Sequence, residues 1–217
     1  MAFCFLTTVP KTGLHLMRHI LGMNKIRIHA GVMAYAKDDM AYMAQCQIYP
    51  AGISGHMEYH CELADFAQHL PSFTILRDPR DTIVSAYHYM DKIPDRHPFA
   101  NVPGQLDVFY RNYHGEERMD LLIENYRKHF DAFIPWLETN IKAVRYEDLI
   151  ERPTLALIPV AFSTGYDLDM LVERAGYRGG KTFRKGVAGE WRHEFTDKQV
   201  RRFNELYGRV MEAWGYE

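Results

Sequence analysis

The sequence has few cysteines and no long hydrophobic run, and both absences restrict what the protein can be. Its 217 residues contain 3 cysteines, Cys4, Cys46 and Cys61, which form no paired motif. A sparse, odd set of cysteines is typical of a reducing compartment and argues against a disulfide framework. No stretch reaches the roughly 18 apolar residues that a membrane-spanning helix requires. We therefore expect no membrane as a partner.

A strong excess of charge of one sign is also missing. Lysine and arginine number 26 and aspartate and glutamate 28, so the formal net charge is -2. A chain so close to neutrality has no overall field to attract nucleic acid or an anionic membrane. We expect no nucleic-acid partner, and any anion-binding site must be a local arrangement of side chains.

The N-terminus lacks the basic segment with which a secretory signal peptide begins. Its apolar stretch, residues 3–9, runs directly into the loop Pro10-Lys11-Thr12-Gly13, which has functional character and which cleavage would remove. We therefore expect a cytoplasmic protein.

Short apolar runs alternate along the chain with longer segments of helical periodicity. Such alternation predicts parallel strands joined by helical crossovers. We expect an α/β fold, a single αβα domain over residues 1–217 with a central parallel sheet. The predicted strands are residues 3–9, 26–29, 51–56, 72–76 and 141–145, and the predicted helices are residues 14–21, 34–45, 58–70, 79–90, 118–138 and 196–214.

The alternation breaks between Asp91 and Gly115, where three prolines and a glycine interrupt the pattern. Irregular segments of this length inside a compact domain are usually functional. We predict a substrate-facing cap at about residues 91–115. Its aromatic side chains suit a modest organic ligand, although such residues also pack ordinary cores; they are Phe99, Phe109, Tyr110 and Tyr113.

The loop at residues 10–13 places Lys11, Thr12 and Gly13 directly before a predicted helix. Backbone N–H groups at such a position can cradle a phosphate, and the lysine can reach a group that is being transferred. The spacing G-x-x-x-x-G-K-[ST] of nucleotide triphosphatases is absent. Taken alone, the segment is equally compatible with a turn that carries a solvated lysine.

A second candidate follows the predicted strand at residues 72–76. Arg77 stands at the carboxyl end of that strand, which in an open α/β sheet faces the ligand crevice. Ser85 lies eight residues further on, two turns into the next helix, and can share an anion with Arg77. The structural alternative is a group of ion pairs among Arg77 and the charged residues after it.

These two segments and two later ones resemble, in order, the motifs of sulfotransferases that use 3′-phosphoadenosine 5′-phosphosulfate (PAPS). Residues 10–13 resemble the P-K-[ST]-G loop, and residues 77–85 resemble R-[DN]-P-[RK]-D-x-x-V-S. Residues 146–149 resemble Y-E-D-L, and residues 184–191 resemble R-K-G-x-x-G-[DE]-W. The resemblance covers nearly the whole chain and is thin over residues 91–140.

The resemblance implies a role for each matching residue in binding the donor. Residues of the first loop and helix would hold the 5′-phosphosulfate, and Tyr146 would lie near the adenine. The 3′-phosphate would be bound by Arg77, Ser85, Arg184, Lys185 and Gly186. The residues on the 5′ side are Lys11, Thr12, Gly13, Leu14 and His15.

The chain departs from the family where the first helix begins. The family usually has two hydroxyl residues where this sequence has Leu14 and His15, so some contacts are lost or are replaced by His15 or by backbone N–H groups. Leu16 stands where a tryptophan commonly stacks on adenine. Residues 192–201 do not match the dimerisation motif of the vertebrate cytosolic branch, which leaves the oligomeric state open.

His56 is the candidate general base, and Lys11 is the candidate that stabilises the transferred group. His56 ends the predicted strand at residues 51–56, where many family members carry a catalytic histidine. A histidine ordinarily titrates near neutral pH, which suits a base that must lose its proton again after each turnover. A surface or capping histidine is the alternative, with Glu58 and His60 next in line. The spacing of His56, His60 and Cys61 does not form a zinc motif, so no metal is expected.

The resemblance thus implies a sulfotransferase acting on a hydroxyl, or a nitrogen, of a small-molecule acceptor and releasing 3′-phosphoadenosine 5′-phosphate (PAP). One alternative is a module that binds PAPS or PAP without catalysis, which the altered Leu14-His15 pair keeps open. The other is an ATP-dependent phosphotransferase, but it needs a Walker loop and a magnesium carboxylate that are not evident.

Overall fold

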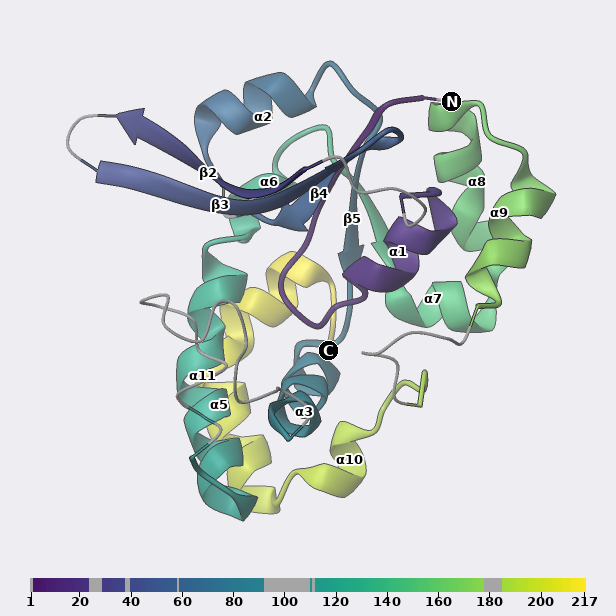
Figure 1. Ribbon diagram of the computed structural model, residues 1–217. Coiled ribbons are helices and arrows are strands. Elements are labelled where there is room, and N and C mark those ends of the chain that lie inside the picture. The colour runs from purple at the N-terminus through teal and green to yellow at the C-terminus, as the bar shows by residue number, and fades with distance from the viewer. Residues whose placement is uncertain are drawn as a thin grey trace. The chain divides into compact units, whose positions relative to one another are not determined.

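The chain forms two compact units in the computed structural model (Figure 1), which describes residues 2–23, 29–37, 40–57, 59–91, 110, 112–177 and 185–217. Unit 1 comprises Met1–Arg77 and Ala132–Val187, and unit 2 comprises Asp78–Asp131 and Ala188–Glu217. The single-domain organisation expected from the sequence stays a prediction. Most of the predicted cap, residues 92–109 and 111, lies outside the described residues.

Unit 1 is built on a sheet whose described strands run in the order β2-β3-β4-β1-β5-β6. The middle strand β1 pairs in parallel with β4 and β5, and β5 pairs in parallel with β6. An antiparallel hairpin, β2-β3, extends the sheet beyond β4. The predicted α/β class with a central parallel sheet is confirmed. The strands are β1 (Cys4–Thr7), β2 (His29–Lys37), β3 (Met40–Tyr49), β4 (Gly52–His56), β5 (Ser72–Leu76) and β6 (Lys142–Arg145).

The two central strands are buried along their whole length. Every residue of β1 and of β5 is buried, and the register pairs Phe5 with Ser72 and Leu6 with Phe73. Parallel strands that are covered on both faces read in a sequence as continuous apolar runs. This explains why the strand predicted at residues 72–76 is confirmed with the same bounds.

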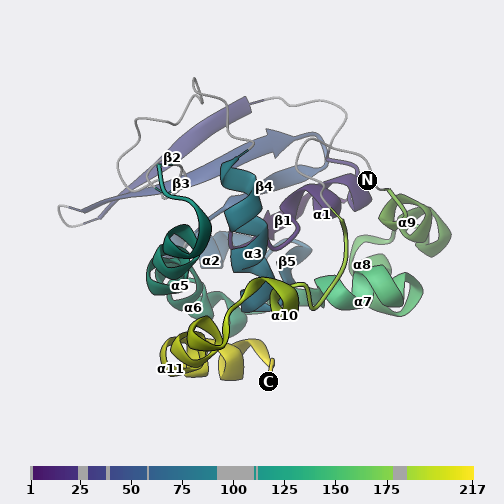
Figure 2. The same ribbon diagram turned by 90° about the horizontal axis from the view of Figure 1, so that it is seen from below.

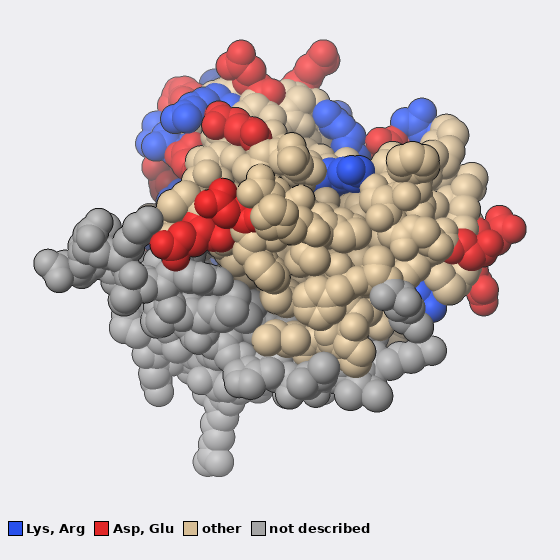
Figure 3. Space-filling view, turned by 90° about the horizontal axis from the view of Figure 1, so that it is seen from above, with Lys and Arg blue, Asp and Glu red and all other residues tan. Residues whose placement is uncertain are grey.

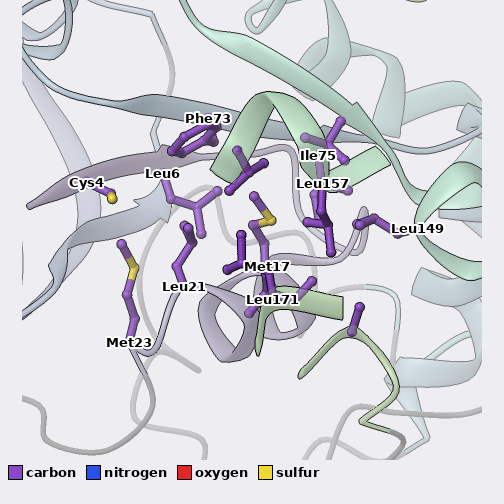
Figure 4. Close-up of a cluster of buried hydrophobic side chains, with 14 of the residues drawn as sticks. Cys4, Leu6, Met17, Leu21, Met23, Phe73, Ile75, Leu149, Leu157 and Leu171 are labelled. Atoms are coloured by element: carbon purple, nitrogen blue, oxygen red, sulfur yellow. The ribbon is translucent and has the colours of Figure 1, made fainter. Parts of the chain in front are cut away.

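Helices cover both faces of the unit 1 sheet. On one face, strand residues meet residues of α1, α8 and α9 in a buried cluster; Figure 4 shows Leu6, Phe73, Ile75, Met17, Leu157 and Leu171 in it. On the other face, the Trp136 ring packs 5.5 Å from that of Phe5, and its indole N–H donates to the Met57 carbonyl at 2.9 Å. The helices are α1 (Leu14–Ile20), α2 (Cys61–Ala67), α6 (Ile134–Leu137), α7 (Tyr146–Glu151), α8 (Pro153–Thr164) and α9 (Leu168–Ala175).

The described residues of unit 2 form helices, which Figure 2 shows from below. Helix α11 packs on α5, and the Tyr207 hydroxyl donates to the Ile123 carbonyl at 3.0 Å. Thr196 and Gln199 form a reciprocal capping box that starts α11, at the residue where the sequence predicts a helix to begin. The helices are α3 (Pro79–Met90), α5 (Gly115–Asp131), α10 (Trp191–Glu194) and α11 (Asp197–Trp214). None of the helices described in either unit is both long and apolar enough to span a membrane.

The helix predicted at residues 34–45 is wrong. These residues belong to the β2-β3 hairpin, in which Lys37 pairs with Met40 and β3 pairs with β4. The segment is rich in alanine and methionine, which favour helices, but pairing with a sheet already formed overrides such weak preferences. The single helix predicted at residues 118–138 is two helices, α5 and α6, which lie in different units.

Gly52 is the glycine for which substitution is expected to damage unit 1 most. Its φ is 148°, and a Cβ there would lie 2.0 Å from the Cys4 carbonyl oxygen of the neighbouring strand. Gly52→Ala is therefore expected to lower the free energy of unfolding by more than about 2 kcal/mol. Gly165→Ala is the matched control, because Gly165 also has a positive φ but a Cβ there meets open space. Equal losses for both variants in urea denaturation would contradict this expectation.

Candidate functional site

The loop at residues 10–13 joins β1 to α1 and has an uncommon backbone. Lys11 has a φ of 72°, a left-handed conformation that costs a residue with a side chain roughly 1 kcal/mol or more. The buried Thr12 closes the loop by donating its hydroxyl proton to the Val9 carbonyl at 2.9 Å. Strain of this kind persists only where surrounding structure enforces it, and it gathers at functional sites.

Gly13 is required for close packing at the start of α1. Its φ is 131°, and a Cβ there would lie 3.2 Å from side-chain atoms of both Ile75 and Tyr146. The next residue, Leu14, is 5% exposed and belongs to the unit 1 core. Any part that Leu14 plays in donor binding would therefore run through its backbone.

Arg77 brings segments of all four motifs together within unit 1. It follows β5 directly and is 7% exposed. Its guanidinium lies 4.5 Å above the ring of Tyr146, and two of its nitrogens lie 3.5 Å from the carbonyl oxygens of Lys11 and Val187. Its Nε is buried and has no hydrogen-bond partner among the described residues. Long hydrogen bonds and an unsatisfied nitrogen leave this cation poised for an anion.

Of the other described residues predicted to bind the 3′-phosphate, only Lys185 and Gly186 lie next to a residue that Arg77 contacts within unit 1. Lys185 is exposed and Gly186 has a φ of 67°, and both immediately precede the Val187 that Arg77 contacts. Arg184 lies outside the described residues. Ser85 is partly buried on α3 and belongs to unit 2, so its part in the site stays a prediction.

His56 ends β4 and is held by Thr8, the residue that follows β1. Its Nδ1 lies 2.9 Å from the Thr8 carbonyl oxygen. Because a carbonyl can only accept, Nδ1 carries the proton, and Nε2 of the neutral ring is left as an acceptor. Burial lowers the pKa of His56 to about 3; the Thr8 hydrogen bond opposes this shift, and the charges of Arg18, His15 and Lys11 add to it.

The charges of Arg18 and Lys11 also act on His15, the second residue of α1. Loss of solvent around the ring lowers the pKa of His15 to about 4, with Arg18 and Lys11 contributing, although part of its side chain remains exposed. Lys11, His15, Arg18 and His56 thus form one basic group in unit 1. Cationic groups that repel one another in this way are stabilised when an anion binds among them.

One ion pair of the predicted group, between Arg80 and Asp78, is present within unit 2. Arg80 makes hydrogen bonds to both carboxylate oxygens of Asp78, and its guanidinium lies 4.2 Å above the Trp191 ring. The buried Asp81 accepts from the backbone N–H groups of Gly189 and Trp191 at 2.6 and 3.0 Å. The sequence indicates Asp81 only as a possible partner in ion pairs, and it does not predict the contacts of Asp81 with the backbone of Gly189 and Trp191.

Sequence reasoning also missed a stacked pair in unit 1. The rings of His19 and Tyr177 lie 4.1 Å apart at 16°, and Tyr177 is 44% exposed. His19 is three residues after Leu16, so it lies on the same side of α1. This pair offers a flat aromatic surface close to the position at which the expected tryptophan is missing.

Figure 3 shows lysine and arginine side chains interspersed with aspartate and glutamate on the face that it draws. No cluster of three metal-binding side chains occurs within the described parts of the chain.

Comparisons with known proteins agree on one family. The family model of the sulfotransferase domain matches residues 4–174 and 168–215. Sulfotransferase 6B1 of Mus musculus is 28% identical over 156 residues, which are 61% of this chain and 48% of that protein. The chain spans about half the length of the curated relatives that it matches.

Two solved structures share the fold. The crystal structure of mouse sulfotransferase SULT7A1 complexed with PAP aligns with a TM-score of 0.66 and 20% identity, covering 97% of this chain and 84% of that one. Retinol dehydratase in complex with androsterone and the inactive cofactor PAP aligns with a TM-score of 0.51 and 15% identity, covering 76% and 55%. At these identities the likeness concerns the fold alone.

Proposed function

The chain belongs to the sulfotransferase domain family, and from that premise we propose that it transfers the sulfuryl group of PAPS to a small-molecule acceptor. The reacting group of the acceptor is a hydroxyl or a nitrogen, and PAP is released. The observation that carries the proposal is the position of Arg77, a buried arginine that contacts three other motif segments and keeps an unsatisfied Nε.

The donor needs two separate cationic regions because it carries anionic groups at its 5′ and 3′ ends. Arg77, next to the segment that holds Lys185 and Gly186, is suited to the 3′-phosphate, since arginine binds phosphate through paired, charge-assisted hydrogen bonds. Lys11, with His15 beside it, is suited to the 5′-phosphosulfate. The stacked His19 and Tyr177 are suited to the adenine, in place of the tryptophan that Leu16 replaces.

Transfer of a sulfuryl group resembles phosphoryl transfer, in which positioning and charge stabilisation supply most of the catalysis. The acceptor oxygen forms a bond to sulfur as the bond from sulfur to the 5′-phosphate oxygen breaks. Lys11 stabilises the charge that grows on that leaving oxygen. The proton of the acceptor hydroxyl moves to Nε2 of His56, which the Thr8 carbonyl keeps in the required tautomer.

Fold relatives support the choice of donor and acceptor class. The mouse structure holds PAP, and the retinol dehydratase structure holds PAP with androsterone, a small organic molecule. We extend both features to this chain and keep the cytoplasm as its proposed location.

A second function, binding of PAPS or PAP without turnover, is favoured by one observation. A pKa of about 3 makes His56 a weak base in the chain without ligand. Because an anion among Lys11, His15 and Arg18 would oppose their charges, donor binding is expected to raise the pKa of His56. Absence of this rise would favour the binding module.

Calorimetric titration with PAP, AMP and ATP tests the donor site directly. PAP is expected to bind tightly and AMP, which lacks the 3′-phosphate, far more weakly. Arg77→Ala is expected to weaken PAP binding roughly 10²-fold, because it removes a buried cation from a charged hydrogen-bonded site. Arg201→Ala, on an exposed position of α11, is the matched control. Equal affinity for ATP and PAP would overturn the proposal in favour of a phosphotransferase.

A further inference from the structure

Arg18 lies outside the four motifs and is nevertheless buried in unit 1. It is 6% exposed on α1. Its Nε donates to the Ser54 hydroxyl oxygen at 2.7 Å, and an Nη donates to the Ser54 carbonyl oxygen at 3.2 Å. Its guanidinium also lies 5.6 Å from the centre of the Tyr49 ring. Burial of an arginine is costly unless its N–H groups find acceptors, and Ser54 supplies two of them.

The position of this contact in the fold is specific. Helix α1 begins directly after the loop that carries Lys11, and β4 ends at His56, two residues after Ser54. Side chains two apart on a strand point to the same face of the sheet, so Ser54 and His56 share a face. Arg18 therefore joins the helix that follows the donor loop to the strand that presents the candidate base.

The electrostatic environment of His56 agrees with this placement. The groups that act on its ring are the carbonyl of Thr8, the residue after β1, Lys11 from the loop, and His15 and Arg18 from α1. Of Lys11, His15 and Arg18, it is Arg18 whose side chain is anchored on β4. Its guanidinium keeps its positive charge at all ordinary pH values. The charge of Arg18 lowers the pKa of His56 more than the charges of His15 and Lys11 do.

We propose that Arg18 is a positioning residue for the transfer reaction: it ties α1 to the carboxyl end of β4 and places a fixed positive charge beside His56. The tie sets the separation between the donor loop and Nε2 of the base. The charge disfavours the imidazolium before the donor binds, so Nε2 stays unprotonated until the anionic groups of the donor oppose that charge and raise the basicity of the ring. This inference rests on the proposed function, in which His56 is the base.

The test separates charge from anchoring with paired variants. Arg18→Gln removes the charge and keeps a donor for Ser54, whereas Arg18→Lys keeps the charge. The pKa of His56, measured by NMR titration of the ring without donor, is expected to be higher in Arg18→Gln than in the wild type and to stay low in Arg18→Lys. Arg152→Gln, which removes an exposed charge in the same unit, is expected to leave that pKa unchanged.

Kinetics supply the second readout. Arg18→Gln is expected to lower kcat roughly tenfold or more and to weaken PAP binding by a smaller factor, because misplacement of a reacting group affects turnover more than binding. If Arg18→Gln does not fold, Ser54→Ala, which leaves the arginine but removes an anchoring oxygen, is expected to lower kcat in the same way. A wild-type kcat for the variant that folds overturns the inference.

The outcomes also distinguish this inference from the proposed function. Failure of the wild type to bind PAP in calorimetry removes the proposed function, whatever the variants do. Normal PAP binding and turnover in the wild type, together with an unchanged His56 pKa in Arg18→Gln, removes the role of Arg18 alone. A merely structural arginine would lower the melting temperature of Arg18→Gln without moving the His56 pKa.

Discussion

Replacement of His56 by alanine is expected to lower kcat about 10²–10⁴-fold, the usual contribution of a positioned general base. The ring is held for this role, because the Thr8 carbonyl binds Nδ1 at 2.9 Å and so leaves Nε2 to accept the proton. The Kd for PAP is expected to change little, since the base serves the acceptor. Single-turnover kinetics with PAPS and calorimetry with PAP measure the two quantities separately.

His69→Ala is the control for this substitution, because His69 is exposed and lies after α2 in the same unit. Its kcat is expected to match the wild type. Near-normal turnover in His56→Ala would show that another group, with His60 and Glu58 the first to test, takes the proton. Loss of PAP binding together with turnover would instead assign His56 to the donor site.

Replacement of Lys11 by alanine is expected to lower kcat about 10²–10³-fold, the effect of removing a charge that stabilises a transition state. Binding of PAP is expected to persist, because Arg77 and its neighbours remain. Alanine is the suitable replacement, because Lys11 has a φ of 72° and glycine would relieve the strain of the loop as well as remove the charge. Turnover and PAP affinity are measured in the same preparations.

Lys142→Ala is the matched control, since Lys142 is an exposed lysine on β6 of the same unit. Equal losses of PAP affinity and of kcat in Lys11→Ala would mean that the lysine serves binding rather than the transition state. A wild-type kcat would remove Lys11 from the reaction.

Local patterns predicted the bounds of two elements, β5 in unit 1 and α3 in unit 2. The buried apolar run at residues 72–76 and the proline at the first position of the next helix reproduce the bounds of β5 and α3. The P-K-T-G loop was readable for the same reason, since a left-handed φ at Lys11 and the close packing of Gly13 depend on a few adjacent residues.

Patterns of this kind failed where long-range pairing decides the outcome. Residues 34–45 carry helix-favouring side chains, yet the edge that β4 offers to β3 makes them part of a hairpin. The stack of His19 on Tyr177 joins α1 to a residue beyond the end of α9, far away along the chain, and no periodic pattern in the sequence indicates it.

The sequence by itself determined the family, the α/β class and the residue types at the candidate site, because motifs and strand–helix alternation are local. The tertiary structure alone decided which of those residues meet. Arg77 contacts Lys11 across 66 positions and Val187 across 110, and Arg18 reaches Ser54 across 36. Such contacts depend on the order of the strands in the sheet, which the crossover connections set. The periodicity of apolar residues predicts single helices and strands but does not predict that order.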